Sequence, residues 1–337
     1  MRVLIAGLGA IGQRHARNLR TLRPDIELLA YRQRRLRHVI TETLACDAGR
    51  DVEAELGIRA FTDLGEALAT RPQAVFVCTP SSQHLDIALR AVEHGVHLFI
   101  EKPVSHTIDD TERLAGAVAQ RGLVALVGCQ WRFHPGIVRL RALLTSGVLG
   151  QVRTAEIEYA EYLPDWHPYE DYRTSYAARA ELGGGVVLTH IHDYDLAWWL
   201  FGAPREVVAT GGHESDLEID VEDTVRATLS TPASRVSVSQ SFASRDIRRR
   251  ITVTAEKATV TVDLAAGRLD VRPPVAPGLS FVDYQRNDMF TAELAHFLAC
   301  IEHGAAPLIP LAEGIAVLRV ALAVQESLRS GRLVTLE

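Results

Sequence analysis

Cysteine is scarce in this chain, and its few cysteines follow no motif. Only four of the 337 residues are cysteine, and Cys46, Cys78, Cys129 and Cys300 lack the spacing of a metal-binding cluster. Cys78 and Cys129 fall in or beside apolar stretches that are typical of strands. A disulfide framework is therefore not expected, and the reducing cytoplasm fits the sequence better.

Strong charge of one sign and long apolar runs are also missing. The formal net charge is −6, which provides no basic footprint for nucleic acid or an anionic membrane. No apolar run approaches the length of a membrane span. The N-terminus enters an apolar segment without a charged leader and cleavage site, so we expect no signal peptide. Hydrophobic residues make up 47% and charged residues 23%, as in a globular protein long enough for two domains.

What the chain does have is a glycine-rich motif near its start. Residues 2–6 are apolar and strand-like, and residues 13–22 have a helical pattern. Between them stands a G-x-G-x-x-G motif that consists of Gly7, Leu8, Gly9, Ala10, Ile11 and Gly12. Such glycines permit a tight turn and a close approach of the backbone to a pyrophosphate, which binds at the helix N-terminus. Strand, loop and helix in this order predict a dinucleotide site.

The end of the second predicted strand, residues 26–31, bears on the choice of cofactor. NAD sites usually place an acidic residue there to bind the ribose 2′-hydroxyl. Here Arg32, Arg34 and Arg35 stand in its place. Because guanidinium groups suit a 2′-phosphate, we expect NADP, with NAD as the alternative. A solvated basic turn is the other interpretation of these arginines.

Strands and helices continue to alternate through the first part of the chain. Further apolar runs typical of buried strands occupy residues 74–78, 96–100 and 123–127. Thr107 and Asp110, three residues apart, resemble a capping box before the last predicted helix of this part. Strict alternation predicts an α/β Rossmann domain over residues 1–128, with a doubly wound parallel sheet.

The pattern changes after about residue 150. Polar and apolar residues alternate in four segments, 224–230, 235–242, 251–254 and 259–264. This alternation indicates an antiparallel sheet with one covered face. Two helices with apolar stripes end the chain. We therefore expect an α+β domain over residues 129–337, for substrate binding and oligomerisation, whose terminal helices can pack back on the first domain.

Two segments contain candidate catalytic residues. Lys102 follows the predicted strand at 96–100, and open α/β sheets bind ligands at the carboxyl ends of their strands. His192 and Asp195 are three apart in a stretch with helical spacing that begins at residue 186, where a carboxylate can orient an imidazole. His190 and His192 are two apart and diverge on a helix, so no metal site is expected. Alternatively, these histidines make only polar contacts in a domain interface.

Taken in order, several motifs resemble those of the Gfo/Idh/MocA oxidoreductases, the glucose–fructose oxidoreductase and inositol dehydrogenase family. They are the glycine motif at 7–12, Cys78-Thr79-Pro80 with His84, Glu101-Lys102-Pro103, Arg132-Phe133-His134-Pro135, and Gly183-Gly184-Gly185 followed by His192-x-x-Asp195. The resemblance covers essentially the whole chain. It implies a Rossmann domain, a second domain with a large, mostly antiparallel sheet, and hydride exchange between a pyridine nucleotide and a secondary hydroxyl carbon of a sugar, sugar derivative or cyclitol.

The resemblance also implies roles for single residues. Lys102 would contact the reacting oxygen, and His192 would be the general acid/base. The residues expected to line the cofactor are Thr79, Pro80, His84, Glu101, Lys102 and Gln130, with Gln130 where many members have Asn. A cis peptide is implied before Pro103. Thr189 stands where many members have an Asp that supports the histidine, and Asp193 or Asp195 are candidate replacements.

Substrate contacts are expected from polar and aromatic residues, which suit hydroxyl-rich rings. Besides Lys102 and His192, the candidates are Arg132, Trp166, Tyr172, Arg173 and His190. Trp166 and Tyr172 also fit a core role. In the expected reaction a base takes the hydroxyl proton, and Lys102 stabilises the developing alkoxide.

Other functions remain open. Relatives of this kind include dinucleotide and sugar sensors without turnover, and NAD-dependent glycoside hydrolases. We expect a small-molecule sugar or cyclitol substrate, no nucleic-acid, membrane or metal partner, and a cytoplasmic homodimer or homotetramer formed through the sheet of the second domain.

Overall fold

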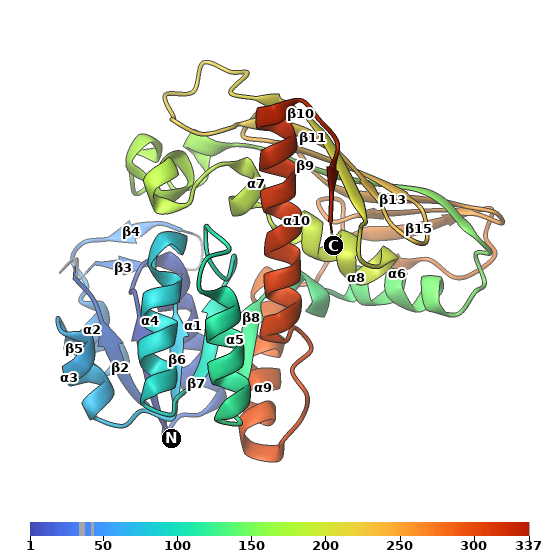
Figure 1. Ribbon diagram of the computed structural model, residues 1–337. Helices are drawn as coiled ribbons and strands as arrows, with labels where there is room; N and C mark the ends of the chain where they lie inside the picture. The colour runs from blue at the N-terminus through green and yellow to red at the C-terminus, as the bar shows by residue number, and fades with distance from the viewer. Residues whose placement is uncertain (34–37, 42–43, 337) are drawn as a thin grey trace. The chain divides into compact units, whose positions relative to one another are not determined.

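The computed structural model describes residues 1–33, 38–41 and 44–336 (Figure 1). The chain forms two compact units. Unit 1 comprises Met1–Gly128, His167–Asp171 and Phe290–Ile315. Unit 2 comprises Cys129–Trp166, Tyr172–Met289 and Ala316–Glu337. Helices α9 (Arg286–His303) and α10 (Leu311–Ser330) each contribute residues to both units.

Unit 1 is built on a six-stranded sheet in the order β5-β2-β1-β6-β7-β8. Its strands are β1 (Arg2–Ala6), β2 (Glu27–Tyr31), β5 (Ile58–Phe61), β6 (Ala74–Val77), β7 (His97–Glu101) and β8 (Ala125–Gly128). All neighbouring strands run parallel. The strand order reverses between β1 and β6, and such a reversal places a ligand crevice at the carboxyl ends of the strands. The predicted doubly wound parallel sheet is confirmed.

Helices and short elements connect the strands of unit 1. They are α1 (Ala10–Leu22), α2 (Val52–Leu56), α3 (Leu64–Ala69), η1 (Ser81–Gln83), α4 (His84–Glu93) and α5 (Thr111–Gln120), with a small sheet of β3 (Val39–Ile40) and β4 (Cys46–Asp47). The apolar stripe of α9 enters the core of this unit, where Leu294, Phe297 and Leu298 join the buried Phe76 and Phe99.

The start of α5 differs from the sequence expectation. The helix begins at Thr111, because Asp110 has a left-handed backbone (φ 58°) that cannot continue a right-handed helix. Asp110 makes no side-chain cap bond, and the Thr107 N–H donates to Ser105 Oγ at 3.3 Å. The predicted capping box of Thr107 and Asp110 is therefore wrong.

Unit 2 is built on a nine-stranded sheet in the order β16-β15-β14-β13-β9-β12-β11-β10-β17. Its strands are β9 (Val152–Tyr162), β10 (Glu206–Gly212), β11 (Thr224–Ser230), β12 (Arg235–Ser241), β13 (Ala243–Ala255), β14 (Thr259–Asp263), β15 (Arg268–Arg272), β16 (Leu279–Ser280) and β17 (Val334–Thr335). The pair of β9 and β12 is parallel and the remaining pairs are antiparallel. A mostly antiparallel sheet was expected and is confirmed.

Short helices occupy the connections of unit 2. They are η2 (Gln130–Phe133), α6 (Pro135–Thr145), η3 (Leu163–Asp165), η4 (Tyr172–Thr174), η5 (Tyr176–Ala178), η6 (Ala180–Leu182), α7 (Val186–Thr189) and α8 (His192–Phe201). The helical spacing from residue 186 onward belongs to two helices, because α7 ends at Thr189 and α8 begins only at His192. No helix within the described ranges is both long enough and apolar enough to cross a membrane.

Candidate active site

The glycine loop between β1 and α1 has no room for side chains at two positions. Gly7 has a φ of +98°, and a Cβ there would lie 2.7 Å from the carbonyl oxygen of Cys78. A Cβ on Gly12 would lie 2.0 Å from the carbonyl oxygen of Gly7. The helix that follows has Gly9 as its N-cap and no side-chain cap bond. The first N–H groups of α1 are thus available to an anion such as a pyrophosphate, which fits a dinucleotide.

Thr79 and Pro80 follow β6, the strand that neighbours β1 in the sheet. The Thr79 Oγ1 atom is buried and has no hydrogen-bond partner among the described residues. A buried hydroxyl without a partner is costly, so this atom also fits a polar group of a bound cofactor. Pro80 is the N-cap of η1.

The arginines after β2 are only partly described. Arg32 is buried, and its Nη1 lies 2.9 Å from Oε1 of Glu53 on α2. Arg34 and Arg35 lie outside the described residues. The one arginine of this group that can be placed thus has a carboxylate as its neighbour.

Lys102 follows β7, so it lies at the carboxyl ends of the parallel strands, as the glycine loop and Thr79 do. Its side chain is half-buried. The peptide bond between Lys102 and Pro103 is cis, as the resemblance implied. The Glu101 side chain, expected to line the cofactor, is buried, and its Oε1 lies 2.7 Å from Nε2 of His15 on α1. Its Oε2 accepts the N–H of Lys102 at 3.3 Å.

His84 is the first residue of α4, and it contacts the backbone next to Lys102. Its Nδ1 is 2.8 Å from the carbonyl oxygen of Pro103, and its Nε2 is 2.8 Å from that of Thr79. Burial lowers the pKa of His84, and the two carbonyls act in the opposite direction by favouring the protonated ring. The side chain therefore joins the backbones that follow β6 and β7.

In unit 2, His192 is the first residue of α8 and is buried. Its Nε2 lies 3.5 Å from Nε2 of Gln130, which begins η2. The Gln130 amide is thus one neighbour of this ring nitrogen. Thr189, three residues earlier, is buried at the end of α7.

The two aspartates that follow His192 have other partners. Asp195 is bound by Arg132 through two hydrogen bonds, Nε to Oδ2 at 3.0 Å and Nη2 to Oδ1 at 2.6 Å. Both side chains are almost completely buried. Asp193 accepts a hydrogen bond from Gln240 Nε2 at 2.8 Å. Burial raises the pKa of Asp193 to about 7, while Gln240 and the charge of Arg249 act in the opposite direction.

His190 lies in the break between α7 and α8, within a cluster of aromatic rings. Its ring stacks on Tyr159, with 3.4 Å between centroids, and meets Trp166 and Phe242 edge to face at 4.9 and 5.6 Å. Gln240 Nε2 donates to the His190 carbonyl oxygen at 2.8 Å. The structure thus brings together two of the predicted substrate contacts, His190 and Trp166.

Glu161 on β9 connects the polar atoms of this aromatic cluster. Tyr159 donates its hydroxyl to Glu161 at 2.5 Å, and Trp166 donates its indole N–H to the same oxygen. Arg249 on β13 donates to the other oxygen, from Nη2 at 2.6 Å and from Nε at 3.0 Å. Burial would raise the pKa of Glu161, but Arg249 and the other donors hold it below its usual value.

Tyr172 and Arg173 lie on η4. Arg173 is exposed and pairs with Glu218 through Nη1 and Oε2 at 2.7 Å. The Tyr172 hydroxyl accepts the Glu218 N–H at 3.3 Å. Both residues therefore contact the same loop segment.

Sequence reasoning missed His15, Glu161, Gln240 and Arg249. A signal existed for His15, because Ile11, His15, Leu19 and Leu22 follow one face of α1 and a histidine in an apolar stripe is buried with a partner. Glu161, Gln240 and Arg249 are polar residues on strands, and only strand pairing brings them near α8.

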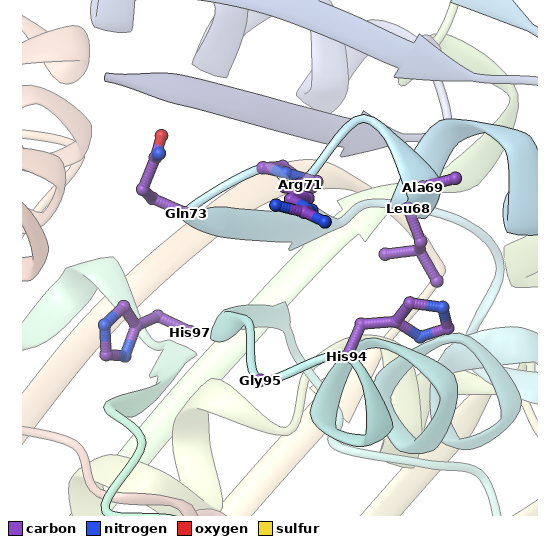
Figure 2. Close-up of a pocket in the computed structure, with 8 residues that line it drawn as sticks. Leu68, Ala69, Arg71, Gln73, His94, Gly95 and His97 are labelled. Carbon is purple, nitrogen blue, oxygen red and sulfur yellow. The ribbon is translucent and has the colours of Figure 1, made fainter.

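A cavity of about 630 Å³ opens at the opposite edge of the unit 1 sheet (Figure 2). Its lining residues are Leu68, Ala69, Arg71, Pro72, Gln73, His94, Gly95 and His97. They stand at the amino ends of β6 and β7, away from Gly7 and Lys102, so this cavity does not belong to the dinucleotide site. In the described part of the chain, no group of three His, Cys, Asp or Glu side chains is arranged to hold a metal ion.

Two sequence models of one family match the chain. The model described as an oxidoreductase family with an NAD-binding Rossmann fold matches residues 1–129, and the GFO/IDH/MocA C-terminal domain matches residues 137–261. The chain belongs to the Gfo/Idh/MocA family of oxidoreductases. The resemblance drawn from the sequence motifs is confirmed.

Two named relatives match most of the chain. The scyllo-inositol 2-dehydrogenase (NAD(+)) of Bacillus subtilis is 27% identical over 100% of this chain and 96% of its own. The UDP-N-acetylglucosamine 3-dehydrogenase of Acidithiobacillus ferrooxidans is 29% identical over 89% of this chain and 88% of its own. The predicted class of enzyme, an NAD(P)-dependent dehydrogenase or reductase, is confirmed.

Solved structures agree with this fold. The Acidithiobacillus ferrooxidans enzyme superposes with a TM-score of 0.77 at 26% identity and covers 98% of both chains. The WlbA dehydrogenase from Bordetella pertussis, solved with NADH and UDP-GlcNAcA, has a TM-score of 0.83 at 23% identity, over 100% of this chain and 99% of its own. The second likeness shows the fold alone.

Proposed function

We propose that this enzyme transfers a hydride between a nicotinamide and a secondary hydroxyl carbon of a sugar, sugar derivative or cyclitol. The observation that carries this proposal is the position of Lys102, which follows β7 at the sheet edge that also bears the glycine loop and Thr79. The relatives named above act on scyllo-inositol and on UDP-N-acetylglucosamine, and both molecules contain a hydroxyl-rich ring.

For the cofactor we propose NAD, with the NADP expected from the sequence as the alternative. The glycine loop and the N-terminus of α1 would hold the pyrophosphate, and Thr79 would contact a polar group of the cofactor. Arg32 has its ion pair with Glu53, which weakens the case for a 2′-phosphate, and one relative is named for NAD(+). A bound nicotinamide supplies the hydride acceptor or donor.

The proton chemistry is assigned to two residues. His192 would take the hydroxyl proton during oxidation and return it during reduction, because an imidazole exchanges protons near neutral pH. Lys102 would stabilise the negative charge that develops on the same oxygen. Gln130 would orient His192, since its amide lies beside Nε2 of the ring.

The remaining predicted contacts divide into two groups. His190 and Trp166 would provide part of a platform for a hydroxyl-rich ring, on the support of Tyr159. Arg132 would instead fix α8 through Asp195, because both hydrogen bonds lie inside unit 2 and are buried. Tyr172 and Arg173 stay predicted substrate contacts. A substrate role for the part from residue 129 onward, a homodimer or homotetramer and a cytoplasmic location also stay predictions.

The test is a substrate panel followed by the absorbance of the reduced nicotinamide. Scyllo-inositol, myo-inositol and UDP-N-acetylglucosamine are each offered with NAD⁺ and with NADP⁺. We expect turnover of at least one of them, with higher kcat/KM for NAD⁺. Lys102→Ala and His192→Ala should each lower kcat by about 100-fold or more while NADH still binds.

Specific outcomes would contradict this function. Near-normal turnover by either variant would remove that residue from its role. Cofactor and sugar binding without turnover would indicate a sensor. Tightly retained NAD, no net reduction and release of a sugar from a glycoside would indicate a hydrolase. His94→Ala, at the cavity on the opposite edge of the sheet, is the matched control and should retain full kcat.

A further inference from the structure

Lys102 stands between two neighbours that are each held by a buried histidine. The Glu101 carboxylate is bound by His15, and the Pro103 carbonyl oxygen is contacted by His84. His15 and His84 come from α1 and α4, the helices that follow the glycine loop and the Thr79 segment. The two histidines thus connect both expected cofactor loops to the segment that carries the lysine.

The hydrogen bond between His15 and Glu101 is buried among aromatic rings. The imidazole is completely buried, and the rings of Phe76, Phe99 and Phe290 surround it at centroid distances of 5.6, 5.0 and 6.3 Å. Its Nδ1 has no hydrogen-bond partner among the described residues, so a neutral ring that donates from Nε2 to Glu101 leaves no buried N–H unsatisfied. In such apolar surroundings a hydrogen bond to a carboxylate is strong and its loss is costly.

The Glu101 carboxylate connects His15 to the backbone of Lys102. One carboxylate oxygen is fixed by His15, and the other accepts the N–H of Lys102. The carboxylate also packs against Gly128, where an added Cβ would lie 3.3 Å from its Cδ and Oε1. Free rotation of the Glu101 side chain is therefore prevented from two sides.

His84 fixes the other neighbour. Its two ring nitrogens face the Pro103 and Thr79 carbonyl oxygens at 2.8 Å each, and the side chain is almost completely buried. A displacement of this ring would release the backbone segments that follow β6 and β7.

We propose that His15 and His84 are positioning residues that hold Lys102 through Glu101 and Pro103. This inference rests on the proposed function of Lys102. A lysine side chain is long and flexible, so its ammonium can be aimed at a reacting oxygen only if its backbone is fixed. Misplacement of a catalytic group by about 1 Å costs on the order of 100-fold in rate. Neither histidine needs to touch the substrate for this effect.

The experiment compares His15→Leu and His84→Leu with the control His97→Leu. His97 is a histidine of the same strand as Glu101, at its other end, where its Nδ1 accepts the Val124 N–H at 3.0 Å. Four quantities are measured: Tm, the Kd of NADH from its fluorescence, kcat and KM with the best substrate of the panel, and the pH dependence of Lys102 acetylation by trace acetic anhydride, followed by mass spectrometry. The last measurement needs no substrate.

We expect His15→Leu and His84→Leu to lower kcat by about 10-fold to 100-fold, with KM changed by less than about 3-fold. The NADH Kd should stay within about 3-fold in His15→Leu and rise in His84→Leu, because His84 also holds the Thr79 carbonyl of the expected cofactor loop. The acetylation profile of Lys102 should change in both variants. His15→Gln should recover much of kcat, because its amide N–H can replace the donor to Glu101. His97→Leu should lower Tm by a similar amount and leave kcat and Lys102 acetylation unchanged.

The inference is overturned if His15→Leu and His84→Leu keep the wild-type kcat and the wild-type acetylation profile of Lys102. It is also overturned if His97→Leu, with the same decrease in Tm, lowers kcat as much as these two variants do. Should the leucine variants not fold, Glu101→Gln tests the same link. A glutamine amide has one acceptor oxygen, so it cannot accept from both the His15 N–H and the Lys102 N–H at separate oxygens as the carboxylate does. An unchanged Lys102 profile in that variant therefore contradicts the inference. Absence of turnover by the wild type would reject the proposed function, whereas the acetylation profiles would still decide this inference.

Discussion

At the residue scale, the Gln130 amide is a neighbour of His192, the proposed general acid/base. Gln130 contacts Nε2 of the ring, while Asp193 and Asp195 are bound by Gln240 and Arg132. An amide can orient an imidazole but brings no negative charge to stabilise its protonated form. A negative charge introduced at position 130 should therefore shift the pH dependence of kcat.

Gln130→Glu tests this control. The new carboxylate would favour the charged imidazole and move the acid limb of the kcat profile to higher pH, by about 1 unit. Gln130→Ala is the control, which should lower kcat without moving that limb because it removes orientation and adds no charge. An acid limb that stays in place in Gln130→Glu would contradict the proposed role of His192 as the general acid/base.

Asp193 gives a prediction for stability. Its pKa in the folded protein is about 7, above the ordinary value of 3.8, because the carboxyl is buried. The folded state therefore favours the protonated form, and the carboxyl costs stability progressively as the pH rises from 3.8 toward 7. Asp193→Asn should raise the free energy of unfolding at about pH 8 by on the order of 4 kcal/mol, and by less at about pH 5.

Urea unfolding at the two pH values measures this effect. Asp195→Asn is the matched variant two residues further along α8, and it should have the opposite sign. It leaves the buried Arg132 guanidinium without its carboxylate, which costs about 3–5 kcal/mol. A destabilised Asp193→Asn variant at alkaline pH would contradict the account of Asp193.

The residues of the site differ in how well the sequence predicts them. The cis peptide before Pro103 was implied by the family resemblance and is present in the structure. The contact of His192 with Gln130 was not predicted, since Gln130 is far from it in the chain and the break at His190 changes which side chains share a face of the helix. Arg34 and Arg35, on which the preference for NADP partly rested, lie outside the described residues.

At the scale of elements, the segment made of β1, the glycine loop and α1 contains two glycines with different surroundings. A Cβ on Gly12 would collide with the Gly7 carbonyl oxygen at 2.0 Å, whereas a Cβ on Gly9 would meet nothing within 4 Å. Gly9 also has an ordinary backbone conformation, with a φ of −72°. Gly12 thus permits the turn itself, and we propose that Gly9 leaves space for the pyrophosphate.

Gly9→Ala and Gly12→Ala test this division. Gly9→Ala should keep the Tm of the ligand-free protein and weaken NADH binding by at least about 10-fold, because the methyl group occupies the approach to the pyrophosphate. Gly12→Ala should lower Tm as well, since the backbone must shift. Thermal unfolding with and without NADH measures both effects, and unchanged NADH affinity in Gly9→Ala would exclude this loop as the pyrophosphate site.

Strands with a clear alternation of polar and apolar residues were predicted well. Strands whose position depends on pairing with distant segments were not. Residues 224–230 form β11 as expected, because alternation alone defines a half-buried strand. The central strand β9 was not predicted, although it pairs with both β12 and β13. The capping box at Thr107 failed because local spacing does not reveal the left-handed backbone of Asp110.

At the scale of the whole molecule, the order of predicted strands and helices indicates the two kinds of sheet that the structure contains. Alternation of strands and helices predicts the parallel sheet, and period-two alternation predicts the second sheet. The sequence left open whether the terminal helices pack back on the first domain, because an apolar stripe does not specify the surface that it covers; Phe290–Ile315 belongs to unit 1. Substrate identity is equally hidden, since the motifs that define the family concern the cofactor and the lysine.

The central claim is direct hydride exchange between a ring hydroxyl carbon and the nicotinamide. The most direct measurement is the fate of deuterium from fully ring-deuterated inositol, turned over with NAD⁺ and followed by mass spectrometry of the reduced cofactor. The account predicts that one deuterium appears on the reduced nicotinamide and that Lys102→Ala forms almost none. Reduced cofactor without deuterium, or conversion of inositol while NAD⁺ shows no net reduction, would contradict it.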